Sequence, residues 1–126
     1  MEKAVLHIFE SHPEVKLVYL FGSMARGDHG PMSDYDFAVY LDEKDKKETT
    51  RIRFQLMDAL SRALGTDRID VVILDSVESP ELKYNILQGG KLIFEREPFR
   101  VLVEPRILNE YFDFNLLLRR HGLTAA

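Results

Sequence analysis

Two aspartates stand close together, shortly after a glycine–serine pair, in the first third of this chain. Gly22-Ser23 is followed, after ten further residues, by Asp34-Tyr35-Asp36, and an apolar run lies on the outer side of each motif. Because successive side chains of a strand point to opposite faces, both aspartates would share one side and the tyrosine would point away. Two like charges so close repel each other unless a cation lies between them. Mg²⁺ suits this position, since it binds carboxylate oxygens together with substrate phosphates. Simple turn residues at the start of a strand are the alternative interpretation.

The glycine–serine pair lies where an apolar run ends and a turn begins. Glycine at position 22 lets a phosphate approach the backbone closely, and free amides at a helix start favour an anion. The Ser23 hydroxyl could donate to the terminal phosphates of a nucleotide. Arg26 follows three residues later, and it could face a phosphate or lie on the surface. The dipeptide alone is a common turn, so its meaning depends on the aspartates that follow.

A third carboxylate interrupts a later apolar run. Asp70 stands alone within residues 69–74, IDVVIL, and a lone buried carboxylate is costly without a partner. If this run forms a strand beside the one that begins at Asp34, Asp70 completes a cluster of three carboxylates. Such a cluster could hold two metal ions that activate an attacking hydroxyl and stabilise a leaving pyrophosphate. A surface aspartate at a strand edge is the alternative.

The motifs lie among segments that alternate between helix and strand. Apolar periodicity, capping residues and glycines predict the following order: a helix over 2–11, a strand over 17–21, a helical turn and loop over 23–33, a strand over 37–41, a helix over about 47–64 ended by Gly65, a strand over 69–74, a helix from Ser79-Pro80 to Gln88, a strand over 91–95, and a helical tail over 98–120 that Pro105 kinks or interrupts. This order is typical of the α/β or α+β class, with one sheet of about four strands.

Composition restricts the class of protein further. The chain has 126 residues, enough for one domain, and no cysteine, which excludes disulfides and thiolate metal sites. Its apolar runs are too short to span a bilayer, and residues 1–4 lack the features of a signal peptide. We therefore expect a cytoplasmic protein with no membrane partner. The net charge of −4 argues against broad electrostatic binding to nucleic acid.

The C-terminal tail is unusually apolar for a chain end. The apolar residues concerned are Leu108, Tyr111, Phe112, Phe114, Leu116, Leu117 and Leu118. They either pack on the sheet of this domain or form a surface for a partner, because large exposed apolar patches mark interaction sites.

Taken together, these residues resemble the nucleotidyltransferase superfamily that includes DNA polymerase β and the kanamycin nucleotidyltransferases. The signature of that superfamily is Gly-Ser, roughly ten residues, Asp-x-Asp, and a later aspartate on a following strand. The segments LFGSMARGD and SDYDFAVYL are similar to the first two strands of its minimal nucleotidyltransferases. Members of that group are often encoded beside a small helical HEPN-domain protein, and the pair acts as a toxin–antitoxin module. The resemblance extends over about residues 15–95.

The resemblance implies a fold, an activity and a set of site residues. The fold would be the nucleotidyltransferase fold, a mixed sheet flanked by helices, with a catalytic domain over 1–97. Residues 98–126 would be a helical tail that belongs to the same domain or binds a partner. The enzyme would transfer AMP from ATP to a tyrosine of a HEPN ribonuclease toxin and so silence it in a hetero-oligomer.

The same resemblance assigns roles residue by residue. Asp34 and Asp36 would hold two Mg²⁺ ions, and Asp70 would complete the metal site and help to deprotonate the acceptor hydroxyl. Gly22 and Ser23 would hold the triphosphate.

Two alternatives stay open from the sequence. The protein could neutralise its toxin by contact, with an idle catalytic site, or it could transfer AMP to a small molecule or RNA. A stable complex that neutralises without ATP would indicate the first alternative. AMP transfer to an antibiotic or tRNA, with none to a partner protein, would indicate the second.

Overall fold

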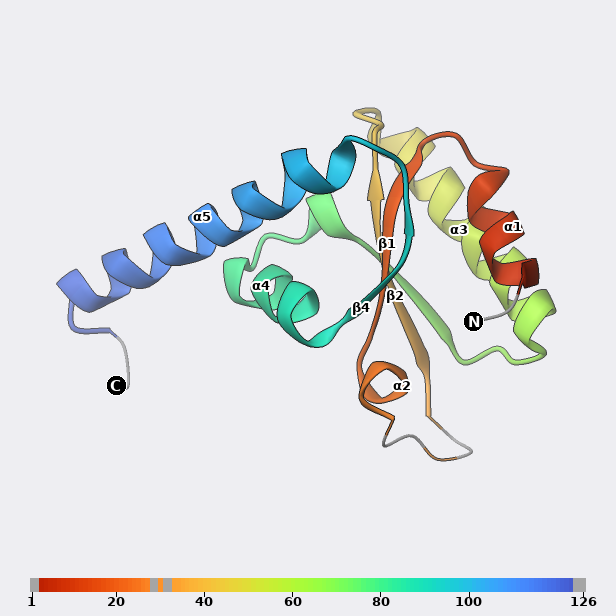
Figure 1. The fold of residues 1–126 in the computed structure, drawn as a ribbon, viewed down its shortest axis with the longest axis horizontal. Helices are drawn as coiled ribbons and strands as arrows, with labels where there is room; N and C mark the ends of the chain where they lie inside the picture. The colour runs from red at the N-terminus through yellow and green to blue at the C-terminus, as the bar shows by residue number, and fades with distance from the viewer. Residues whose placement is uncertain (1–2, 28–29, 31–32, 124–126) are drawn as a thin grey trace.

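Four strands form one mixed sheet in the computed structural model, which describes residues 3–27, 30 and 33–123 (Figure 1). The strands are β1 (Val15–Phe21), β2 (Tyr35–Leu41), β3 (Ile69–Ile73) and β4 (Lys91–Glu95), in the spatial order β3-β2-β1-β4. β1 is antiparallel to both of its neighbours, β2 and β4, whereas β2 and β3 are parallel. The predicted α/β or α+β class with about four strands is confirmed.

Helices α1 (Lys3–Glu10) and α3 (Lys46–Leu64) cover one face of the sheet. Strand residues that alternate along β2 and β3 point towards these helices and meet their apolar sides. Phe9 of α1 packs edge-on against Phe37 of β2, with ring centroids 5.9 Å apart. The parallel pairing of β2 with β3 requires a crossover connection, and α3 provides it.

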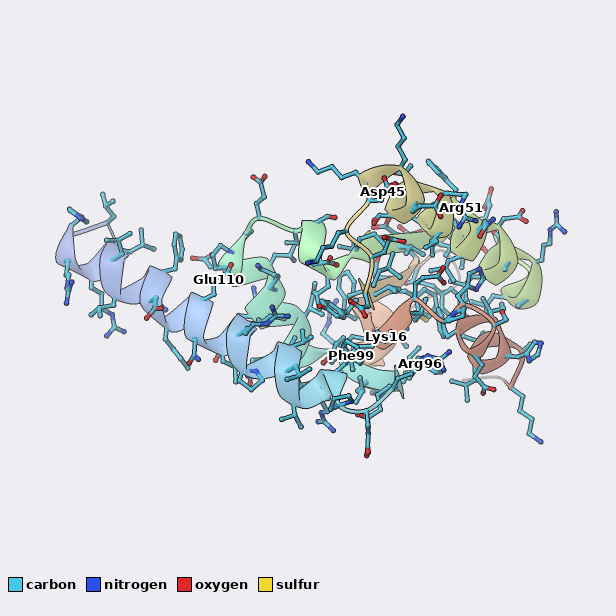
Figure 2. All side chains as sticks on the ribbon, turned by 90° about the horizontal axis from the view of Figure 1, so that it is seen from above. Lys16, Asp45, Arg51, Arg96, Phe99 and Glu110 are labelled. Atoms are coloured by element: carbon cyan, nitrogen blue, oxygen red, sulfur yellow. The ribbon has the colours of Figure 1, made fainter. Side chains whose placement is uncertain are left out.

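Helices α4 (Pro80–Gly89) and α5 (Phe99–Arg120) pack on the opposite face. Ile86 of α4 and Val103 and Ile107 of α5 bury Leu17, Tyr19 and Ala38 of the sheet, together with Leu74 of the short 3₁₀ helix η1 (Leu74–Ser76). The Tyr19 hydroxyl donates to the Glu104 carboxylate at 2.5 Å, which joins β1 to α5. Figure 2 shows Lys16 and Phe99 at the end of α5 that lies on the sheet, and Glu110 further along this helix.

Capping residues set the predicted helix ends. Gly65 follows α3 in the left-handed conformation, with φ of 67°. The Ser79 side chain accepts a hydrogen bond from the Leu82 amide at the start of α4. The helical turn predicted after Gly22 is α2 (Ser23–Arg26), and part of the loop predicted over 23–33 lies outside the described residues.

Proline 105 does not interrupt the C-terminal helix, so that part of the prediction is wrong. α5 runs through Pro105 as one assigned helix of 22 residues. The missing amide leaves the carbonyl of Val101 without its helical donor. Since 74 % of Val101 is exposed, water can satisfy that carbonyl. Within the described ranges, none of the helices is both long and apolar enough to cross a membrane.

Candidate active site

The chain turns sharply at the end of β1, and glycine is required at the turn. Gly22 has φ of 74° and ψ of −156°, a backbone region that is essentially restricted to glycine. A side chain at this position would also overlap the carboxylate of Asp36. This close approach arises because Phe21 and Asp36 are partners in the antiparallel ladder. The structure thus brings the glycine and one aspartate of the two predicted motifs into direct proximity.

Two of the predicted carboxylates lie side by side on adjacent strands. Asp36 of β2 and Asp70 of β3 are partners in the parallel ladder, and neighbouring strands are about 4.8 Å apart. Tyr35 and Phe37 pack into the core on the α1 and α3 side, with their rings stacked. Residues alternate between the faces, so Asp36 and Asp70 both lie on the opposite face. The predictions that β3 adjoins β2 and that Tyr35 points away are confirmed.

Asp34, the residue before β2, adds a third carboxylate to the cluster. Burial raises the pKa of Asp36 above that of an ordinary carboxyl, and the charges of Asp70 and then Asp34 raise it further. Each of these two neighbours is therefore close enough to make the Asp36 carboxylate harder to ionise. The side chain of Asp34 remains 58 % exposed, so the cluster opens to solvent.

Two arginines from other segments face the outer carboxylates. Arg53 of α3 donates from Nε to the Val71 carbonyl at 2.6 Å, and its Nη2 lies 3.8 Å from Asp70 Oδ1. Nη1 of Arg68 lies 3.7 Å from Asp34 Oδ1. Arg53 therefore reaches around the free edge of β3 from the helix that covers the other face.

The burial on which the argument for Asp70 depended is wrong. Its side chain is 51 % exposed, because β3 is an edge strand and Asp70 lies beside an open hollow. That hollow is lined by Asp34, Asp67, Arg68, Ile69 and Asp70. Asp70 is thus both an aspartate at a strand edge, as in the alternative interpretation, and a neighbour of Asp36.

Sequence reasoning missed both arginines. Arg68 precedes Asp70 by two residues, so a charged group at the start of the predicted strand gave some signal. Arg53 gave none, because it lies on the polar side of a long helix and meets Asp70 only through the tertiary fold. Arg26, the last residue of α2, is exposed, and its predicted role towards phosphate stays a prediction, as does that of Ser23 at the start of α2.

These carboxylates have the ligand chemistry that a divalent cation requires. Among the residues that the structure describes, no three carboxylate or imidazole side chains already surround one point as metal ligands. The nearby donors are carboxylate oxygens, which suit Mg²⁺. A cation would also relieve the repulsion that raises the pKa of Asp36.

Comparison with known protein families agrees with this geometry. The family model described as polymerase beta, nucleotidyltransferase, matches residues 3–99 of this chain. The chain belongs to this nucleotidyltransferase family. The matched range includes the three carboxylates and all four strands, so the predicted nucleotidyltransferase fold and enzyme class are confirmed.

Two relatives of this nucleotidyltransferase carry more specific names. A protein of Methanocaldococcus jannaschii, provisionally named a protein adenylyltransferase, is 32% identical over 79 residues, which are 63% of this chain and 77% of that relative. Protein adenylyltransferase MntA of Aphanizomenon flos-aquae is 29% identical over 96 residues, 71% of this chain and 63% of the relative. The chain therefore spans less than two thirds of the second relative.

Solved structures with a similar fold come from toxin–antitoxin complexes. A chain of a toxin–antitoxin crystallised with AMP-PNP has a TM-score of 0.75 and 25% identity, over 93% of this chain and 91% of that one. A chain from the complex of tri-AMPylated Shewanella oneidensis HEPN toxin with MNT antitoxin has a TM-score of 0.67 and 24% identity, over 92% and 87%. The second likeness concerns the fold alone.

Proposed function

We propose that this nucleotidyltransferase transfers AMP from ATP, with Mg²⁺ bound, to a tyrosine hydroxyl of a HEPN ribonuclease toxin in the cytoplasm. It would thereby act as the antitoxin. The observation that carries the proposal is the pairing of Asp36 with Asp70 on adjacent strands, with Gly22 against the Asp36 carboxylate. The two relatives named as protein adenylyltransferases support transfer to a protein. The similar chain from a toxin–antitoxin complex with AMP-PNP supports ATP as the donor.

The proposed reaction is a displacement at the α-phosphorus of ATP. The acceptor oxygen bonds to this phosphorus, the bond to the oxygen that bridges to the β-phosphate breaks, and pyrophosphate leaves. Asp70 accepts the proton of the acceptor hydroxyl, which its half-exposed position beside the hollow allows. Catalysis of this type depends mainly on positioning and on stabilising charge.

Each remaining site residue has a defined part in the proposal. Asp34, Asp36 and Asp70 would hold two Mg²⁺ ions, which supply positive charge to the triphosphate and the leaving pyrophosphate. Gly22 lets the triphosphate approach the backbone, and Ser23 donates a hydrogen bond to it. Arg26 adds positive charge at the end of α2.

Neutralisation by contact is the second candidate function. It is favoured by one observation, the large exposed apolar side chains of α5, which the transfer reaction does not use. Contact and modification are compatible, and separate variants distinguish them.

Intact mass spectrometry tests the proposal directly. The chain is incubated with Mg²⁺, ATP and the toxin encoded beside it, and both proteins are weighed. We expect the toxin to gain one or more AMP units with the wild-type chain and none with Asp34→Asn/Asp36→Asn. The matched control is Asp58→Asn, which changes an exposed aspartate on α3 that forms an ion pair with Arg62. No mass gain on the toxin, with a gain on tRNA or an antibiotic, would contradict the protein acceptor.

A further inference from the structure

Helix α5 carries most of the large apolar side chains that are exposed in the described part of the chain. Five of the eight such residues lie on it: Val101, Leu102, Phe112, Leu116 and Leu117. We refer to these five residues as the α5 surface. Phe112 is 56 % exposed and the two leucines of the last turns are about half exposed. Only Val103 and Ile107 of the same helix are buried.

Three residues of the α5 surface lie on the side of the helix opposite its buried residues, and the Phe112 ring among them also packs edge-on against Tyr84 of α4, with centroids 6.2 Å apart. Leu117 follows Val103 by 14 residues and lies nearer the buried side of the helix. Phe112 follows Val103 by nine residues, which is two and a half helical turns, so these side chains lie on opposite sides of the helix. Val101, Phe112 and Leu116 are separated by 11 and four residues and therefore share one side. Figures 1 and 2 show that the C-terminal part of α5 extends beyond α4 and the sheet. A second protein can therefore lie along this helix.

The α5 surface is also remote from the carboxylates. Tyr40, near the far end of β2, meets α5 through the Phe99 ring at 6.2 Å and through Arg106 Nη2 at 3.4 Å from its hydroxyl. Asp36 precedes Tyr40 by four strand residues, or about 13 Å. From there α5 leads further away, whereas α2 lies at the opposite end of the strands, where β1 ends (Figure 1). A partner bound to the α5 surface leaves the catalytic end open.

The comparisons show that α5 belongs to the fold shared with a toxin–antitoxin chain but not to the matched family range. The nucleotidyltransferase family model ends at residue 99, where α5 begins. The similar chain from the toxin–antitoxin complex matches 93% of this chain, so about nine of the 126 residues are unmatched and most of α5 has a counterpart there. Helix α5 therefore lies outside the shared catalytic unit but within the fold shared with that complex.

We infer that the α5 surface docks the toxin, and that docking and AMP transfer occupy separate surfaces of this protein. The inference rests on the proposed function for the identity of the partner. It assigns residues 1–97 to catalysis and 98–126 to binding. Apolar side chains at helical spacing fit the grooves between helices of a helical partner, and a central aromatic residue such as Phe112 is a typical anchor. A toxin held on α5 reaches the catalytic end through an extended segment, or a second toxin molecule is modified there.

Binding and transfer are measured separately to test this inference. Affinity for a ribonuclease-inactive toxin is compared for the wild-type chain, Leu116→Asp/Leu117→Asp and Val101→Asp. Leu82→Asp is the matched control, since Leu82 is exposed to 41 % on α4. We expect each α5 variant to weaken binding at least 100-fold and the control by less than threefold. At a toxin concentration above the weakened Kd, AMP transfer by the α5 variants should stay within threefold of wild type.

Each outcome of this experiment decides a different point. Unchanged affinity in both α5 variants overturns the docking surface. A wild-type chain that is dimeric alone, and monomeric with Leu116→Asp/Leu117→Asp, assigns the surface to a second copy and also overturns it. Loss of transfer in proportion to binding at saturating toxin contradicts the separation of the two surfaces. Toxin binding that depends on α5 without any AMP transfer refutes the proposed function and leaves the docking surface intact.

Discussion

Gly22→Ala is the substitution that tests the proximity of the two motifs most closely. The backbone at Gly22, with φ of 74° and ψ of −156°, costs an alanine about 1–3 kcal/mol. The new methyl group would also overlap the Asp36 carboxylate, and such overpacking costs a further ~1–3 kcal/mol. We therefore expect the free energy of unfolding to fall by roughly 2–6 kcal/mol, and AMP transfer to be lost because Asp36 is displaced.

Urea denaturation and the transfer assay measure the two effects. Gly65→Ala is the control, because Gly65 also has a positive φ, 67°, yet a side chain there would meet nothing within 4 Å. It should cost only about 1 kcal/mol and leave transfer unchanged. In an Asp36→Ala background the carboxylate is absent, so Gly22→Ala should cost less stability by the amount that the overlap contributes. A double-mutant cycle measures this difference. Equal costs in both backgrounds, or normal transfer by Gly22→Ala, would show that Gly22 does not have to lie against the Asp36 carboxylate.

Three further substitutions test the site and its supports. The pKa of Asp36 is raised in the folded protein, so ionisation of this carboxyl opposes folding at neutral pH. Asp36→Asn should therefore raise the melting temperature in metal-free buffer and abolish AMP transfer. A lower melting temperature would contradict this. Arg53→Ala should lower the free energy of unfolding by about 1–2 kcal/mol, since it removes a hydrogen bond to a strand carbonyl. Arg51→Ala removes a surface ion pair and should lower it by less than about 0.5 kcal/mol. Equal losses of stability in urea denaturation would exclude a special role for Arg53. Tyr19→Phe should cost about 1 kcal/mol by removing the hydrogen bond to Glu104 and leave AMP transfer unchanged, whereas reduced transfer would link this contact to catalysis.

The elements that position the site follow from local sequence signals. Glycine at the end of α3, serine and proline at the start of α4, and short apolar runs for the strands each act within a few residues. Such signals depend on backbone conformation and periodicity, which neighbouring residues determine. The pairing of β3 with β2 was predicted from a single lone carboxylate, and the parallel register of Asp36 with Asp70 confirms it.

What the sequence did not reveal depends on tertiary structure. Arg53 meets Asp70 only because α3 crosses the sheet beside the edge strand. The exposure of Asp70 follows from the position of β3 at that edge, which an apolar run cannot indicate. Pro105 was expected to kink or interrupt the tail, yet solvent around Val101 lets the helix continue. In each case the result depends on a residue that is distant in the sequence or on contact with solvent.

We propose that this protein moves AMP, and not a terminal phosphate, from ATP to a toxin hydroxyl at its carboxylate cluster. Labelled ATP tests it most directly. The chain, Mg²⁺ and the toxin are incubated with ATP carrying radioactive phosphorus at the α or the γ position, beside parallel reactions with Asp36→Asn. We expect label on the toxin from α-labelled ATP only, and no label with Asp36→Asn. Label from γ-labelled ATP, or transfer that persists in Asp36→Asn, would contradict it.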